Sequence, residues 1–269
     1  MTTYWRRLKA VCAERGTLCV GIDPHPSLLA SWGLTNDPAG LEACARGMVA
    51  AIGSQVAVFK PQSAFFEAHG SAGVAVLERV LADIRDAGAL SILDVKRGDI
   101  GSTMDAYADA YLADGAPLVA DAITVSPYLG FGSLMPAFER AHEYERGVYV
   151  LARTSNPEGG QVQLALCTDA EGSVAQEIID AAKELNHRGR QRAIGLVIGG
   201  THDNLGCDVS DFNGSLLVPG IGAQGGRVED LPALFGEAID NVLPMVGRGV
   251  MAAGPDPEAL ARKVREFLI

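Results

Sequence analysis

The chain has 269 residues, of which 48% are hydrophobic and 20% charged, so it has enough apolar material for a large core and too much for a disordered protein. With 33 acidic against 22 basic residues, the formal net charge is −11, which argues against a protein that binds nucleic acid or a membrane surface through a basic footprint. This length could hold two domains, but α/β barrels of this size are usually single domains, and we expect one domain over residues 1–269.

Short apolar runs rich in β-branched residues recur along the whole chain, and each is short enough for a strand. They occupy residues 18–22, 56–59, 90–95, 122–125, 148–151, 194–198, 215–218 and 242–246. Helix-like stretches such as 73–87 and 173–185 lie between them, with apolar residues at spacings of three and four. This alternation predicts a parallel sheet. Eight such units favour a closed (β/α)8 TIM barrel over an open doubly wound sheet, which periodicity alone leaves possible.

Charged residues stand at the ends of the first three predicted strands. Asp23 follows the first and Lys60 the second, and the third ends in Asp94 and Lys96, where a barrel would place its active site. Residues two apart in an extended strand point to one side, so Asp94 and Lys96 should project together. Carboxylates and ammonium groups held close together stabilise each other's charge, which is useful in catalysis. The alternative is a structural salt-bridge network at the barrel rim.

A helix is predicted shortly after the third strand. The Arg97-Gly98 pair should break the strand, and a helical pattern starts at Thr103, so Asp99 and Thr103, four residues apart, share one side of its start. Ser102 and Asp105 fit a capping box.

The last strands lead to segments suited to an anion. The glycine-rich segment 219–226 follows the seventh predicted strand, and Arg248 follows the eighth. Glycines let backbone N–H groups approach a phosphate, and Arg248 would supply a counter-charge, although a tight turn would use the same glycines. Ser155, after the fifth strand, could by itself merely cap a turn.

The cysteines and histidines indicate no metal or triad chemistry. The five cysteines are scattered without a CxxC pair, as expected of free thiols in a reducing compartment. No histidines have metal-ligand spacing, and no serine stands in a GxSxG elbow. The first residues lack the apolar stretch of a signal peptide, and no run is long enough to cross a membrane, so we expect a cytoplasmic protein.

Taken together, these motifs resemble the orotidine 5′-phosphate decarboxylase family. The resemblance rests on "LDVKRGDIGST", supported in order by "GIDP", "FKPQ", "VPGIGAQGG" and "GRG", and it covers nearly the whole chain. The segments "FKPQSAFFE", "SPYLGFGSL" and "TSNPEG" look like the longer bacterial branch, whose members are homodimeric (β/α)8 barrels. Segments 161–168 and 202–212 match no motif of the family.

The resemblance implies a catalytic role for four residues of the motifs. Lys96 would be the general acid that protonates C6 of the pyrimidine after CO2 leaves, and Asp94 would lie beside the substrate carboxylate. Lys60 would bridge Asp94 and the ribose, while Asp99 would complete the charge network in the neighbouring subunit's site. No cofactor is expected, because an ammonium group can supply both the field and the proton that a carbanion at C6 requires.

The resemblance also implies which residues bind orotidine 5′-monophosphate. Asp23 would bind a ribose hydroxyl and Ser155 would contact the pyrimidine, while Ile100 and Thr103 would reach into the partner's site. The phosphate end of the pocket would be formed by Pro219, Gln224, Gly247 and Arg248.

Two other functions fit part of the pattern. A magnesium-dependent phosphosugar decarboxylase or aldolase of the same suprafamily could use a related strand, although the Lys60 ammonium would compete with the cation. A non-catalytic barrel that binds a phosphorylated ligand would also need the anion site.

Overall fold

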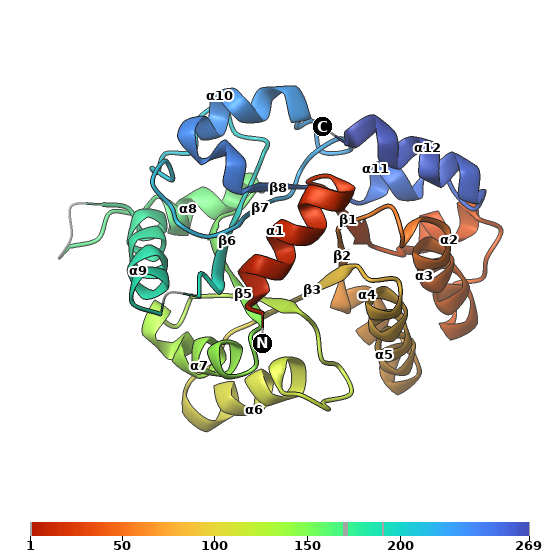
Figure 1. Cartoon of the computed structure of the whole chain (residues 1–269), viewed down its shortest axis with the longest axis horizontal. Helices are drawn as coiled ribbons and strands as arrows, with labels where there is room; N and C mark the ends of the chain where they lie inside the picture. Colours follow the sequence, from red (N-terminus) through yellow and green to blue (C-terminus); the bar gives the residue numbers. More distant parts are fainter. Residues whose placement is uncertain (1, 169–171, 190, 269) are drawn as a thin grey trace.

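A closed barrel organises the molecule (Figure 1). In the computed structural model, which describes residues 2–168, 172–189 and 191–268, eight parallel strands pair in chain order, and the last pairs with the first. This confirms the predicted (β/α)8 barrel. The strands are β1 (Cys19–Ile22), β2 (Val58–Pro61), β3 (Leu90–Arg97), β4 (Ala122–Val125), β5 (Gly147–Arg153), β6 (Ile194–Ile198), β7 (Leu216–Val218) and β8 (Val242–Val246).

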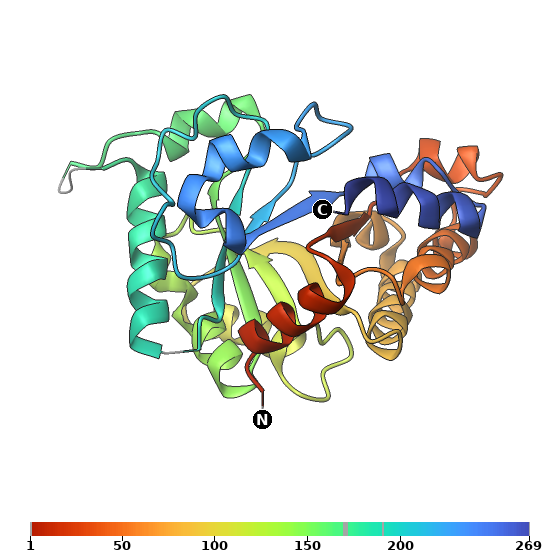
Figure 2. The same cartoon turned by 45° about the horizontal axis from the view of Figure 1, so that its top comes forward.

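Helices surround the strands and, apart from the first helix, follow them in sequence (Figure 2). They are α1 (Tyr4–Arg15), α2 (Pro26–Ser31), α3 (Pro38–Ile52), α4 (Ser63–Glu67), α5 (Gly70–Asp86), α6 (Gly101–Leu112), α7 (Met135–Glu143), α8 (Gly160–Gln163), α9 (Val174–Gly189), α10 (Leu231–Phe235), α11 (Arg248–Met251) and α12 (Pro257–Phe267). Short 3-10 turns lie at Phe131–Leu134, Pro157–Gly159, Val228–Asp230 and Gly236–Asn241. No helix within the described ranges is long and apolar enough to cross a membrane.

Several predicted bounds were wrong at the carboxyl ends of strands. The predicted runs 56–59, 90–95 and 148–151 correspond to strands that continue to Pro61, Arg97 and Arg153. The polar residues there still pair with neighbours, as Lys60 does with Gly21 and Arg97 with Val125, because the hydrogen bonds of a ladder come from the backbone. The predicted helices 73–87 and 173–185 correspond to α5 and α9, which have somewhat different ends.

The predicted capping box at Ser102 was also wrong. Helix α6 already begins at Gly101, and Ile100 precedes it with no side-chain capping bond, so Ser102 lies inside the first turn. A side chain there comes too late to cap the first free N–H groups. The Asp99 carboxylate instead accepts from the backbone N–H of Ile100 at 2.8 Å.

The apolar core has two layers. One cluster fills the barrel interior, and a larger one lies between the strands and the outer helices. Helix α1 lies across the ring of strands in Figure 1 and contributes Tyr4 and Leu8 to the interior cluster. Tyr4 meets Tyr149 of β5 edge to face, and their hydroxyls lie 2.9 Å apart. The interior is thus a packed core rather than a pore.

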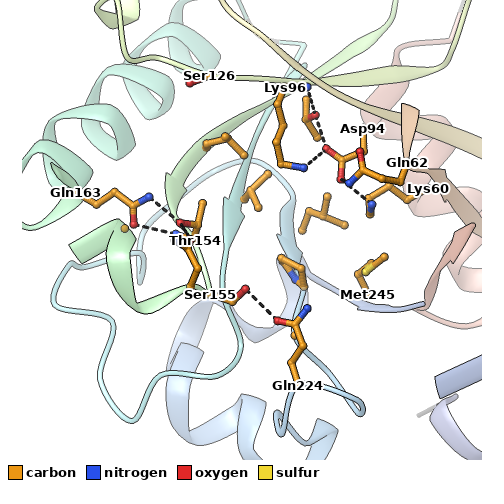
Figure 3. A pocket seen from close by; sticks show the side chains of 18 of the residues that line it. Lys60, Gln62, Asp94, Lys96, Ser126, Thr154, Ser155, Gln163, Gln224 and Met245 are labelled. Atoms are coloured by element: carbon orange, nitrogen blue, oxygen red, sulfur yellow. Dashed lines mark hydrogen bonds and ion pairs between the residues drawn. The ribbon is translucent and has the colours of Figure 1, made fainter. Parts of the chain in front are cut away.

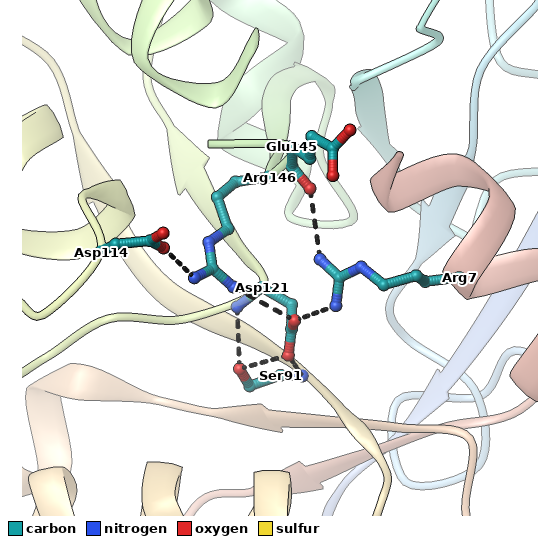
Figure 4. A network of polar contacts seen from close by, with 6 residues as sticks. All are labelled: Arg7, Ser91, Asp114, Asp121, Glu145 and Arg146. Atoms are coloured by element: carbon teal, nitrogen blue, oxygen red, sulfur yellow. Dashed lines mark hydrogen bonds and ion pairs between the residues drawn. The ribbon is translucent and has the colours of Figure 1, made fainter. Parts of the chain in front are cut away.

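A partly buried polar network fastens the amino-terminal end of the barrel (Figure 4). The Asp121 carboxylate, just before β4, accepts from the Arg7 guanidinium of α1 and from the backbone N–H of Ser91 at 3.0 Å. Arg146 lies 3.5 Å from the same carboxylate and bonds Asp114 at 2.7 Å. These contacts tie α1 to β3, β4 and β5 at the end of the strands away from the candidate site.

Candidate active site

Charged side chains from neighbouring strands meet at the carboxyl end of the barrel (Figure 3). Lys60 of β2 donates to Asp94 Oδ2 at 2.6 Å, and Lys96 donates to Asp94 Oδ1 at 2.6 Å. Asp23, just past β1, lies with its Oδ1 3.9 Å from the Lys60 Nζ. The predicted convergence of Asp23, Lys60, Asp94 and Lys96 is therefore confirmed.

Two neutral donors, which sequence analysis missed, complete the surroundings of Asp94. Gln62 donates its amide to Asp94 Oδ2 at 2.9 Å, and the Thr124 hydroxyl donates to Oδ1 at 2.8 Å. Gln62 stands two residues after Lys60, a spacing that could have indicated it. Thr124 lies inside a β-branched run and reads as an ordinary strand residue.

Burial strengthens the electrostatics of this cluster. The side chains of Lys60 and Asp94 are only 5% and 7% exposed. Burial alone opposes ionisation of Asp94, but the Lys60 and Lys96 ammonium groups outweigh it and hold the pKa of Asp94 well below its usual range. Burial likewise opposes the charge on Lys60, whereas Asp94 and Asp23 raise the pKa of Lys60 above its usual value. The pair is thus charged and fixed in place, while the Lys96 side chain remains 47% exposed to the cavity and solvent.

The backbone at Lys96 departs from the extended geometry that the spacing argument assumed. Its φ of 45° lies in the left-handed region of backbone conformation, which residues other than glycine rarely adopt. The pairing of β3 with β4 shifts register between Leu93 and Arg97, so Lys96 lies in a bulge. The two side chains still meet, as predicted, but the bulge rather than simple alternation directs Lys96.

A cavity of about 560 Å³ opens above this cluster. Its lining includes the predicted residues Asp23, Lys60, Asp94, Lys96, Ser155, Pro219, Gln224, Gly247 and Arg248. Apolar side chains from the barrel interior also line it, namely Leu151, Val197, Leu217 and Met245. A cavity lined by apolar side chains with a few charged and polar groups is typical of a site for a small molecule.

Two glycines shape the end of the cavity near Arg248. A Cβ on Gly247 would lie 2.4 Å from Asp23 Oδ2, so a larger residue here would displace that carboxylate. Gly220 has a φ of 103°, and its carbonyl accepts from the N–H of Gly226 at 3.0 Å, which closes the glycine-rich segment on itself. Gln224 of this segment accepts from the Ser155 hydroxyl at 3.3 Å.

The segments without a family motif hold the Thr154–Ser155 pair in place. Gln163 accepts from the Thr154 N–H at 3.0 Å and donates to its hydroxyl at 2.7 Å. Buried Arg153 donates to the carbonyls of Leu205 and Thr154 at 3.1 and 3.4 Å, and to the Gln163 side chain at 3.3 Å. Parts of segments 161–168 and 202–212 therefore act as a scaffold for the wall of the cavity that carries Ser155.

Three predicted residues stay outside the cavity of their own chain. Asp99, Ile100 and Thr103 are not among the described residues that line it. Three large apolar side chains of this region are exposed: Ile100 at 62%, Tyr128 at 79% and Leu129 at 53%. Of these three residues, Tyr128 also lines the cavity, whereas Ile100 and Leu129 are not among its described lining residues.

Metal-ligating side chains are not grouped at this site. Among the residues that the structure describes, no three His, Cys, Asp or Glu side chains are placed to hold an ion together. The Asp94 carboxylate is engaged by two ammonium groups instead. All five cysteines lie in described parts of the chain and are free thiols.

Comparison with known proteins gives a consistent result. Residues 16–264 match the orotidine 5′-phosphate decarboxylase / HUMPS family. The orotidine 5′-phosphate decarboxylase of Salinispora tropica is 54% identical over 97% of this chain and 94% of its own, and that of Streptomyces coelicolor is 52% identical over 100% and 97%. A crystal structure assigned to the same enzyme from Streptomyces avermitilis superposes with a TM-score of 0.94 at 53% identity, over 100% of this chain and 94% of that one.

Proposed function

The chain belongs to the orotidine 5′-phosphate decarboxylase / HUMPS family and decarboxylates orotidine 5′-monophosphate in pyrimidine biosynthesis, and from this premise we propose how its cavity performs the reaction. The proposal assigns the chemistry to Lys96 and its neighbours. The observation that carries it is the ammonium of Lys96, held 2.6 Å from Asp94 beside the cavity.

Lys96 is the proton donor in this proposal. When the bond between C6 and the carboxylate breaks, CO2 leaves and the electron pair stays on C6, where no carbonyl can delocalise it directly. An adjacent ammonium group stabilises the developing negative charge and then transfers its proton to C6, which gives UMP. Lys96 can do both because its long side chain reaches into the cavity while Asp94 fixes its charged end.

Lys60, Asp94 and Asp99 shape the field around that proton. Lys60 and Asp94 form a buried pair of opposite charges, so neither side chain needs to reorganise when the reaction begins. Asp94 lies beside the substrate carboxylate, and Lys60 bridges Asp94 and the ribose. Asp99 completes the alternation of charge from the second subunit, in keeping with its position outside its own cavity.

The remaining residues orient the nucleotide. The Asp23 Oδ1 is buried and has no hydrogen-bond partner in the described part of the chain, as suits an oxygen that accepts from a ribose hydroxyl. Ser155 contacts the pyrimidine, and Ile100 and Thr103 approach from the partner subunit. The phosphate is bound by Pro219, Gln224, Gly247 and Arg248.

The assembly and location follow from the same observations. We propose a homodimer with shared sites, supported by exposed Ile100 next to the Asp99 position and by the exposed pair Tyr128 and Leu129. A single domain over residues 1–269 is supported by the pairing of β1 with β8 across the chain. Five free thiols support a reducing location, the cytoplasm.

The loss of orotidine 5′-monophosphate absorbance tests the proposed mechanism. We expect turnover that a chelator leaves unchanged. Lys96→Ala should fold normally and lose at least about a thousandfold in kcat, because both the charge and the proton are removed. The control is Lys183→Ala, which removes a surface lysine paired with Asp211.

Two results would contradict the mechanism. Turnover abolished by the chelator would favour the metal-dependent alternative. Substantial activity in Lys96→Ala would remove Lys96 as the donor.

A further inference from the structure

We propose that Thr124 is a positioning residue for decarboxylation, which fixes both the backbone of Lys96 and the carboxylate of Asp94. The proposal rests on the roles given above to Lys96 and Asp94. It concerns a neutral residue on β4 that carries out no chemistry itself.

The first observation is the strained backbone at Lys96. Its left-handed φ of 45° falls within the bulge, where β3 has lost its regular pairing with β4. Ile123 and Val125 of β4 still pair with Leu93 and Arg97, so Thr124 lies opposite the bulged residues. The Lys96 N–H donates to the Thr124 hydroxyl oxygen at 2.9 Å instead of to a backbone carbonyl. A side chain thus satisfies the backbone group that the bulge frees.

The second observation is the direction of that hydroxyl. Because its oxygen accepts from the Lys96 N–H, its proton is free to point elsewhere, and it is donated to Asp94 Oδ1 at 2.8 Å. The same Oδ1 accepts from the Lys96 Nζ at 2.6 Å. Three hydrogen bonds therefore run from the Lys96 backbone through the Thr124 hydroxyl and the Asp94 carboxylate to the Lys96 ammonium. The Lys96 side chain closes this ring.

A side chain at position 124 needs a hydroxyl group to close the ring, because it must accept one hydrogen bond and donate another. Thr124 is 1% exposed, and although its residue borders the cavity, its hydroxyl is engaged by Lys96 and Asp94. Valine has the same shape but neither donates nor accepts, whereas serine keeps both functions. Lys96 is long and half exposed, so a fixed backbone and a fixed partner together limit where its ammonium can lie.

The chain contains a matched control at the other end of the same two strands. The Ser91 hydroxyl of β3 accepts from the N–H of Asp121 at 3.0 Å and donates to the Asp121 carboxylate at 3.2 Å. It too is buried, and it too joins a backbone N–H to a carboxylate between β3 and β4 (Figure 4). It lies far from the cavity, so its loss reports the structural value of such a bridge alone.

The experiment compares Thr124→Val, Thr124→Ser and Ser91→Ala with the wild-type protein. The measurements are kcat and KM for orotidine 5′-monophosphate, the Kd of UMP and the melting temperature. We expect Thr124→Val to lose about ten- to a hundredfold in kcat, since hydrogen bonds to charged groups and to the freed N–H are lost. Its UMP affinity should stay within about threefold, because the unreacting parts of the nucleotide are bound elsewhere. Thr124→Ser should keep kcat within about threefold, and Ser91→Ala should change only the melting temperature.

Three results would overturn the proposal: wild-type kcat in Thr124→Val, an equal loss in Thr124→Val and Thr124→Ser, or a loss of UMP affinity as large as the loss of kcat. If Thr124→Val does not fold, Thr124→Ala against Thr124→Ser gives the same comparison. A wild-type protein without turnover, or an active Lys96→Ala variant, would contradict the function and mechanism instead, so the failures are distinguishable.

Discussion

Arg248 brings a positive charge to the cavity from the end of β8. It follows this strand after Gly247 and lines the cavity together with Gln224 of the glycine-rich segment. If it binds the phosphate, its removal should weaken binding of the whole nucleotide, because that contact is formed before and after the chemical step alike.

Arg248→Ala should therefore weaken UMP binding about ten- to a hundredfold, the value of a charge-assisted hydrogen bond. Titration calorimetry with UMP measures it. Arg227→Ala is the control, since Arg227 is an exposed arginine of the same region paired with Glu229. Unchanged UMP affinity in Arg248→Ala would remove this residue from the phosphate site.

At the scale of single residues, sequence analysis identifies charged functional residues more readily than neutral polar ones. Lys60, Asp94 and Lys96 stand out because charges rarely end a buried strand. Thr124 was not identified because threonine is common in strands for reasons unrelated to function. The left-handed backbone of Lys96 has no sequence signal either, since it arises from tertiary pairing between β3 and β4.

At the scale of elements, Arg153 connects three segments that are distant in sequence. It ends β5, is 7% exposed, and contacts the carbonyl of Leu205 and the side chain of Gln163. The His202 ring contacts the Thr154 carbonyl at 2.9 Å from the same side. A buried guanidinium surrounded by neutral acceptors adds polar contacts to loops of which one, 202–212, also packs Leu205, Val209 and Phe212 into the core.

Arg153→Met should loosen these loops and raise KM for orotidine 5′-monophosphate about tenfold, because Ser155 is no longer held against the cavity. Hydrogen exchange should increase within 154–163 and 199–206. Arg146→Met, which breaks the Asp121 network at the opposite end, should lower stability without these effects. Unchanged hydrogen exchange in both segments of the Arg153→Met variant would refute the role of Arg153 in holding these loops.

The loops are also where prediction from sequence is weakest. Strands and helices were found because their apolar periodicity reflects burial on a regular element. Segment 202–212 has three buried apolar residues, Leu205, Val209 and Phe212, but it forms no helix or strand, and the polar contacts of both segments depend on where the barrel places Arg153.

For the whole molecule, the barrel explains why residues from β1 to β8 could be assigned to one site. Parallel strands deliver their carboxyl ends to one face, so any polar strand end becomes a neighbour of the others. We propose that a second subunit completes each site, and a variant of Asp99 tests this proposal.

Lys96→Ala and Asp99→Ala homodimers, each inactive, are unfolded together and refolded as a mixture. About half of the dimers should be hybrids, each with one site built wholly from intact residues, so roughly a quarter of all sites should recover activity. Refolding Lys96→Ala with Asp94→Ala is the control, because both lesions then belong to the same side of the site and no intact site forms. If Asp99 serves its own subunit, the first mixture stays inactive too, with hybrids confirmed by mass.

The seam between β1 and β8 has a consequence for synthesis of the chain. Only Cys19 with Met245 and Val20 with Val246 pair across it in the described residues, and these partners are more than two hundred positions apart. Contacts this distant form late, because a long loop must be ordered first and the ribosome must release the last strand. A nascent chain therefore carries Asp23 through most of translation without Gly247 and Arg248, which line the same cavity, and we expect nucleotide binding to be gained in one step when the end of β8 emerges.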